Sequence, residues 1–323
     1  MDNVSNNVSD NIFKNIQKYS HEEYEYLNLI NKIIENGNIS EGRNGKTKSI
    51  FGEMMRFSLQ ENKIPILTTK KTAWKTCLKE LIWFIRGSTD SKILSNKGVH
   101  IWDGNSSREF LDSRGLVNNP EGILGPIYGY QWRFFNANYD SLTGNRLFEN
   151  LDEAFDENNQ YYKGIDQLQE IIDLLKDPKT RTSRRLILTA WNPCQNYKMA
   201  LPPCHILCQF NVHDNNKLSC CLYQRSADIG LGVPFNILSY SFLTHLIAKH
   251  CDLEAYEFVH FMGNVHIYEE HLDIIKEQIN REPYNFPTIT IKQKKENIND
   301  YYEEDFEINN YKCHELVKMK MIV

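Results

Sequence analysis

Residues 202–226, PPCHILCQFNVHDNNKLSCCLYQRS, hold two apolar runs of strand character separated by a short polar segment. The first run covers residues 205–212 and the second covers residues 217–226. A polar loop such as HDNN between two runs of this kind predicts a β-hairpin. The hairpin would return Arg225 and Ser226 to the start of the first strand, next to Cys204.

Strand and helix patterns are mixed on both sides of this hairpin. Apolar residues at helical spacing predict helices over 22–37, 72–87, 164–178, 235–250 and 267–280. Strand patterns cover 55–60, 185–191, 254–263 and 287–292. No repeat or linker divides the chain, so we expect one large α/β (α+β) domain over 21–323. An Asn- and Ser-rich arm over 1–20 precedes it, and an acidic insertion over about 139–161 interrupts it.

The composition excludes several classes of protein. The 323 residues carry a net charge of −5, which argues against a general nucleic-acid or membrane-surface binder. No apolar run approaches the roughly 18 residues of a membrane span, and the N-terminus lacks a signal-peptide pattern. Most of the eight cysteines lie inside apolar runs, which is typical of buried thiols. We therefore expect a cytoplasmic protein in a reducing compartment.

Cys204 is the candidate nucleophile. Pro202 and Pro203 fix the backbone that enters the strand, so the approach of this thiol is rigidly set. The competing interpretation is a core cysteine at the end of a strand. A nucleophile needs a lowered pKa, and a guanidinium from Arg225 could supply it while holding a phosphate.

Three other patterns allow simpler explanations. The basic segment TRTSRR, with Arg184 and Arg185, is either a solvated turn or part of a phosphate clamp. The segment GLGVPFN lacks the glycine spacing of a dinucleotide-binding loop. Cys204 and His205 would point to opposite faces of a strand, and no second ligand pair follows, so we expect no metal site.

Six motifs in order carry a resemblance to a known family: ELIWFIRGST, LGPIYGYQWR, SRRLILTAWNP, MALPPCH, LYQRSADIGLGVPFNI and GNVHIYEEH. Together they resemble the folate-dependent thymidylate synthases from about Glu22 to the C-terminus, and most closely the eukaryotic and protozoan branch. The resemblance implies a mixed β-sheet packed with helices and an obligate, sheet-to-sheet homodimer. It also implies a methyltransferase that converts dUMP to dTMP with 5,10-methylenetetrahydrofolate and no metal. In that reaction the cysteine adds to C6 of the pyrimidine, C5 attacks the folate methylene, and hydride transfer yields dihydrofolate.

The resemblance assigns roles to individual residues. Cys204 matches the nucleophile, Glu80 the proton-handling carboxylate, Tyr128 a tyrosine near C5, and Asn236 the pyrimidine reader. The resemblance also counts Arg225 and Asp228 among the catalytic residues. The remaining dUMP-binding positions are Arg43, Arg184, Arg185, Arg225, Ser226, His266 and Tyr268, with Arg184 and Arg185 reaching the other subunit's site. The folate-binding positions are Lys70, Trp102, Asp228, Leu231, Gly232, Phe235 and Val323. We expect Lys70 at an exposed position, Glu80 with a raised pKa, and Val323 closing over the ligands.

Some features depart from the family pattern or leave alternatives open. The loop of Arg43, RNGKTKSIFG, is one residue shorter than usual. A pyrimidine nucleotide hydroxymethylase of the same fold is the enzymatic alternative, and a silent RNA-binding or partner-binding relative is the other. Protozoan relatives are commonly fused to dihydrofolate reductase. Because no reductase-sized segment precedes the match here, we expect a monofunctional enzyme or an excised domain, and an mRNA-binding side activity stays open.

Overall fold

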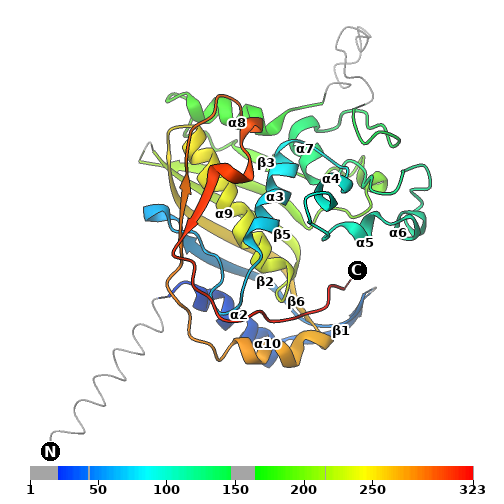
Figure 1. Ribbon diagram of the computed structural model, residues 1–323, viewed down its shortest axis with the longest axis vertical. Coiled ribbons are helices and arrows are strands. Elements are labelled where there is room, and N and C mark those ends of the chain that lie inside the picture. Colours follow the sequence, from blue (N-terminus) through cyan, green and yellow to red (C-terminus); the bar gives the residue numbers. More distant parts are fainter. Residues whose placement is uncertain (1–20, 43, 147–163, 215, 323) are drawn as a thin grey trace, which may run out of the picture.

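The computed structural model describes residues 21–42, 44–146, 164–214 and 216–322. The expected arm over 1–20 and residues 147–161 of the expected insertion lie outside these ranges. Within them, six strands form one sheet in the order β1-β2-β6-β5-β4-β3 (Figure 1). The strands are β1 (Asn38–Gly42), β2 (Gly45–Ser58), β3 (Ile187–Thr189), β4 (His205–His213), β5 (Lys217–Asp228) and β6 (Glu254–Tyr268).

The predicted hairpin is confirmed. β4 and β5 pair in antiparallel fashion, with Phe210 opposite Cys220 and His213 opposite Lys217. β5 and β6 then pair in parallel, which requires a crossover between them. Helix α9 (Gly232–His250) makes that crossover, and nearly all of its residues are buried.

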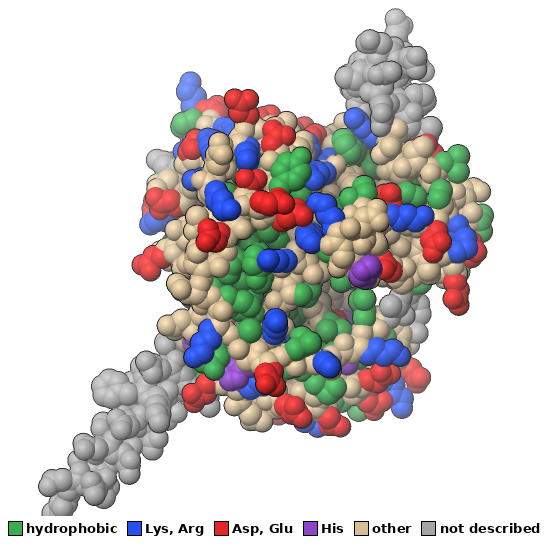
Figure 2. All heavy atoms as spheres, viewed as in Figure 1, with side chains coloured by type: hydrophobic (Ala, Val, Ile, Leu, Met, Phe, Trp, Pro, Cys, Tyr) green, Lys and Arg blue, Asp and Glu red, His purple; other side chains and the backbone are tan. Residues whose placement is uncertain are grey.

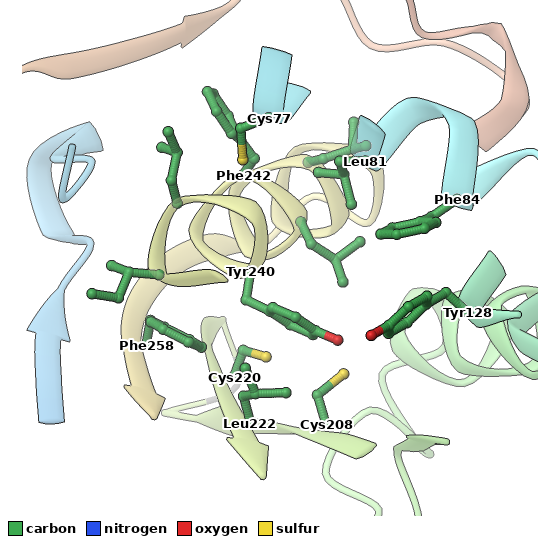
Figure 3. Close-up of a cluster of buried hydrophobic side chains, with 14 of the residues drawn as sticks. Cys77, Leu81, Phe84, Tyr128, Cys208, Cys220, Leu222, Tyr240, Phe242 and Phe258 are labelled. Carbon is green, nitrogen blue, oxygen red and sulfur yellow. The ribbon is translucent and has the colours of Figure 1, made fainter. Parts of the chain in front are cut away.

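The main core lies between the sheet and the helices that cover one of its faces. In Figure 1, α9 and α3 (Trp74–Ile85) lie across the strands, and α2 (Glu23–Asn36) lies near β2. α9 has buried residues on all of its sides, as expected of a helix enclosed by other elements. Figure 3 shows part of this core, to which α9 contributes Phe242, α3 contributes Phe84 and β6 contributes Phe258.

Shorter elements surround this layer. The remaining helices are α4 (Lys92–Ser95), α5 (Asp103–Ser106), α6 (Arg108–Ser113), α7 (Tyr128–Phe134), α8 (Gln167–Lys176) and α10 (Leu272–Gln278). β7 (Thr288–Ile291) and β8 (Phe306–Asn309) form a separate antiparallel pair. The start of the expected 139–161 segment packs on the body of the protein. Tyr139 is buried against Tyr130, and its hydroxyl lies 2.8 Å from Thr89 Oγ1.

Two predicted boundaries are wrong, both at the edges of strands. A helix was expected from Ile267, but β6 continues to Tyr268 and α10 begins at Leu272. Val265 and Ile267 pair with β2 and alternate into the core, which extends the strand pattern through the polar neighbour His266. β2 likewise begins at Gly45, because its polar first half pairs on both sides, with β1 and with β6.

The other face of the sheet carries a row of exposed apolar side chains. Met54 on β2 is opposite Phe261 on β6, which is opposite Tyr223 on β5. These three side chains are between 39% and 43% exposed, although they lie in the middle of the sheet. Phe51, earlier on β2, is 81% exposed. This row, Met54–Phe261–Tyr223, is referred to below as the outer apolar row.

Candidate active site

Cys204 lies immediately before β4, where three elements meet. Its backbone N–H donates to the hydroxyl of Tyr128 on α7, at 2.8 Å. Its carbonyl accepts from the backbone N–H of Arg225 on β5, at 2.9 Å. The thiol therefore has a fixed backbone on both sides, and it stays partly exposed, as a nucleophile must.

Arg225 binds the two prolines that precede Cys204 and β4. Its Nε and Nη2 donate to the carbonyls of Pro203 and Pro202, both at 2.9 Å, and Nη2 lies 3.9 Å from the Cys204 sulfur. The prolines have no N–H, but their carbonyls give the guanidinium two acceptors in a row. The predicted neighbourhood of Cys204 and Arg225 is confirmed.

Burial and charge act in opposite directions on the Cys204 thiol. Burial raises the pKa of Cys204, while Arg225 and the Tyr128 hydroxyl oppose the increase without cancelling it. Arg225 thus favours the thiolate in the direction that the sequence suggested, but burial has the larger effect on the pKa of Cys204. Desolvation disfavours the thiolate more than a single guanidinium at 3.9 Å, already shared with two carbonyls, stabilises it.

Asn236 on α9 is held by a histidine that the motif analysis did not place in the site. Asn236 Nδ2 donates to His205 Nε2 at 2.9 Å. Burial lowers the pKa of His205 to about 3, so the ring is neutral and can accept this bond. The His205 ring also lies 4.7 Å from the Tyr128 ring, between Asn236 and the cysteine loop. One indication in the sequence that His205 belongs to the site is that it directly follows Cys204.

Glu80 and its neighbours form a second group beside Tyr128. Trp102 Nε1 donates to Glu80 Oε1 at 2.7 Å. Burial raises the pKa of Glu80 to about 7, and the bond from Trp102 opposes that rise. The raised pKa of Glu80 is confirmed, and a carboxyl group that titrates near neutrality can both give and take a proton.

Tyr128 connects the two groups. Its ring lies 6.0 Å from Trp102 and 5.0 Å from Phe84, and its hydroxyl receives the Cys204 N–H. In Figure 3 the hydroxyl oxygens of Tyr128 and Tyr240 point toward each other. The φ angle of Tyr128 is 26°, which is strained for a residue with a side chain and is a common feature of functional sites.

The ends of β5 and β6 bring together four further candidates: Ser226 and Asp228 from β5, and His266 and Tyr268 from β6. In the parallel pairing Asp228 is opposite His266, and Ser226 is opposite Asn264. The His266 ring packs edge-on to Tyr268 at 5.3 Å. Burial lowers the pKa of His266 despite the opposing charge of Asp228. Asp228 Oδ1 also accepts from the backbone N–H of Gly230 at 2.9 Å.

Lys70 lies deeper than expected. It is 6% exposed rather than at the surface, and its Nζ donates to the carbonyl of Gly230. Burial lowers its pKa to about 8, while Asp228 and Glu23 oppose that fall. The other folate-side candidates, Leu231, Gly232 and Phe235, lie at the start of α9, after Asp228.

Four candidates remain, of which two are exposed and two lie outside the described residues. Arg184 and Arg185 are exposed and come just before β3. Arg43 and Val323 are not described. In the described ranges, no group of three or more His, Cys, Asp or Glu side chains is arranged to hold a metal. No helix there is long and apolar enough to cross a membrane.

Comparison with known proteins agrees with this geometry. The thymidylate synthase family profile matches residues 24–323. The bifunctional dihydrofolate reductase-thymidylate synthase of Leishmania major is 48% identical over 306 residues, covering 94% of this chain and 56% of that protein. The bifunctional protein of Paramecium tetraurelia is 49% identical over 304 residues, covering 94% and 62%, and that of Zea mays is 48% identical over 305 residues, covering 94% and 55%. The chain thus spans about half the length of these relatives. It belongs to the thymidylate synthase family.

Proposed function

We propose that this chain catalyses the reductive methylation of dUMP to dTMP, with 5,10-methylenetetrahydrofolate as donor of both the carbon and the hydride. The observation that carries the proposal is the position of Cys204, whose sulfur lies 3.9 Å from Arg225 Nη2 and whose backbone N–H donates to the Tyr128 hydroxyl. Family membership and the neighbouring carboxyl group of Glu80, with its pKa of about 7, support it.

The residues divide the chemistry between them. The Cys204 sulfur forms a bond to C6 of the uracil, and the electron pair of the C5–C6 bond moves toward C5 and O4. Glu80, through ordered water, supplies the proton that stabilises the charge at O4. C5 then bonds to the folate methylene as one of the two carbon–nitrogen bonds of that methylene breaks, and O4 returns its proton to Glu80. C5 passes its own proton to water beside Tyr128 as the second carbon–nitrogen bond breaks, which frees tetrahydrofolate and leaves an exocyclic methylene. Hydride transfer from tetrahydrofolate to that methylene gives the methyl group, the C5–C6 double bond re-forms, and the Cys204 thiolate leaves C6.

We assign the contacts with dUMP and with the folate to the side chains described above. Asn236 offers an amide oxygen and N–H to the pyrimidine edge, with its Nδ2 oriented by His205. His266 and Tyr268 receive the sugar hydroxyl, and Arg225 and Ser226 receive the phosphate, together with Arg43. On the folate side we assign Asp228 to the pterin, Trp102 to the aromatic wall, and Lys70 to the glutamate. Leu231, Gly232 and Phe235 line that side, and Val323 closes over it.

We propose that two copies assemble through the outer faces of their sheets. The outer apolar row is too exposed for a surface without a partner, since Met54, Phe261 and Tyr223 are adjacent across three strands. Arg184 and Arg185 leave the same sheet near its β3 edge and are exposed. In a dimer they would reach the phosphate of the other copy. Two further guanidinium groups would also offset the burial that raises the pKa of Cys204.

The wider context is also a proposal. Because the similar proteins of Leishmania major and Paramecium tetraurelia are named as fusions, the native gene of this chain is a candidate for the same fusion. All eight cysteines are free thiols, which suits a cytoplasmic location. Figure 2 shows acidic and basic side chains interspersed over the face drawn. With a net charge of −5, RNA is at most a secondary ligand.

The test uses dUMP tritiated at C5, incubated with the protein and methylenetetrahydrofolate. Tritium release with equal amounts of dihydrofolate and dTMP is expected. Release with tetrahydrofolate and a hydroxymethylated nucleotide would show the hydroxymethylase instead. A folded protein that releases no tritium would refute the catalytic proposal and favour the binding protein.

A further inference from the structure

Glu23 is a fully buried carboxylate to which the reaction outlined above gives no role. It is the first residue of α2 and has 0% exposure. The backbone N–H of Thr68 donates to both of its oxygens, at 3.0 and 2.9 Å, and the N–H of Thr69 donates at 2.8 Å. The hydroxyls of Thr68 and Thr69 each donate at 2.6 Å. A buried carboxylate with this many donors holds the backbone of two successive residues in one geometry.

Other parts of the chain are attached to the same two threonines. Gln278 Nε2, on α10, donates to Thr69 Oγ1 at 2.9 Å, and Arg281 Nη1 donates to the Thr69 carbonyl at 2.8 Å. The N–H of His314, in the C-terminal segment, donates to the Thr68 carbonyl at 2.7 Å. Residues 68–69 are thus the point where α2, α10 and the C-terminal segment meet, with Glu23 at its centre.

Lys70 follows these threonines directly. Its Nζ reaches the carbonyl of Gly230, in the loop that Asp228 holds through the Gly230 N–H. Because Lys70 is 6% exposed, its long side chain has little freedom to compensate for a displaced backbone. The position of its ammonium group therefore depends on the backbone that Glu23 fixes.

We propose that Glu23 is a positioning residue for folate binding, which acts by fixing residues 68–69 so that Lys70 faces the carboxylate of the folate glutamate. This rests on the proposed function, in which Lys70 binds that glutamate. A purely structural role is the alternative, and Glu22 provides the comparison. Its carboxylate is 2.7 Å from Lys63 Nζ and also accepts from the Ser58 N–H, so it anchors the start of α2 without touching residues 68–70.

The experiment compares Glu23→Gln with the matched control Glu22→Gln. The glutamine amide would turn an N–H₂ toward backbone N–H donors, so residues 68–69 lose part of their anchor. We expect Glu23→Gln to raise KM for methylenetetrahydrofolate about tenfold, with KM for dUMP changed less than about twofold. Glu22→Gln should leave both KM values near those of the unmodified protein, whatever it does to the melting temperature.

A double-mutant cycle with Lys70→Met separates the outcomes. In the Lys70→Met background, Glu23→Gln should add little further increase in the folate KM. If Glu23→Gln and Glu22→Gln both lower thermal stability and change neither KM selectively, the positioning role is wrong. If Lys70→Met itself forms dTMP with an unchanged folate KM, the assignment of Lys70 is wrong and the inference falls with it, while the catalytic proposal stands.

A milder variant covers the case in which Glu23→Gln does not fold. Thr69→Val removes the 2.6 Å bond to Glu23 and the bond from Gln278 Nε2 with little change in volume, and it keeps the bonds from the backbone N–H groups of Thr68 and Thr69 to Glu23. It should raise the folate KM in the same selective way but by a smaller factor. A folded Thr69→Val protein with an unchanged folate KM would count against the proposal.

Discussion

Glu80→Gln is expected to make the protein more stable at alkaline pH while removing its activity. Burial raises the pKa of Glu80 from 4.5 to about 7. At about 1.36 kcal/mol per unit, that shift amounts to roughly 3 kcal/mol of stability lost once the group ionises in the folded protein. Glu80 retains some exposure, and solvent screens its charge, so we expect about 1–2 kcal/mol.

The sign of the effect follows from the raised pKa. Below pH 4.5 the group is protonated in both states, and its contribution to stability is fully present. As the pH rises toward about 7, the unfolded chain loses the proton first, and the folded state becomes progressively less stable. Glutamine cannot ionise and still offers Trp102 an acceptor oxygen, so the variant avoids this loss.

Urea unfolding of both proteins at one fixed protein concentration measures the difference. The variant should have the higher midpoint at about pH 8, and the advantage should nearly vanish at about pH 4. Equal advantages at the two pH values would show that Glu80 does not titrate as its burial implies. In that case the proton-handling role would lose its physical basis.

Four further outcomes are expected. Cys204→Ser should lower tritium release at least ~10³-fold, because the hydroxyl is a poor nucleophile, with little change in melting temperature. If each site combines Cys204 of one copy with Arg184 of the other, an equal mixture of Cys204→Ala and Arg184→Ala chains that is unfolded and refolded together should recover about a quarter of the activity. No recovery would refute this sharing of residues between copies. Gly129→Ala should destabilise the protein by about 2–3 kcal/mol in urea, since its methyl group would lie 2.2 Å from the Phe84 carbonyl oxygen. The folate KM should rise above pH 8, where Lys70 loses its charge, and Lys70→Met should abolish this dependence between about pH 7 and pH 9.

The sequence was sufficient for the elements whose patterns are strong. The alternation in β4 and β5 and the polar loop between them predicted the hairpin, and the hairpin placed Arg225 beside Cys204. The apolar stripe of α3 also predicted that Glu80 lies at the edge of a buried region with a raised pKa. Local patterns succeed here because the same residues determine both the element and the site.

The sequence alone did not predict features that depend on contacts between segments far apart in the chain. Lys70 reads as a surface lysine, and its burial follows from Gly230, which lies 160 positions later in the chain. The polar first half of β2 becomes a strand only because β1 and β6 supply hydrogen-bond partners on both sides. The balance between burial and the charge of Arg225 at Cys204 likewise requires distances, which residue types do not provide.

The strand order has a consequence for the synthesis of the protein on the ribosome. β2 ends at Ser58 and can complete its pairing only with β6, which begins at Glu254, about 200 residues later. At 5–20 residues per second, roughly 10–40 s pass between the appearance of the two strands. During that interval the β6-facing edge of β2 and its apolar residues Met55 and Phe57 lack their final neighbours. The nascent chain must therefore be kept from aggregating until β6 has emerged, and a truncated chain that ends before β6 cannot form the native sheet.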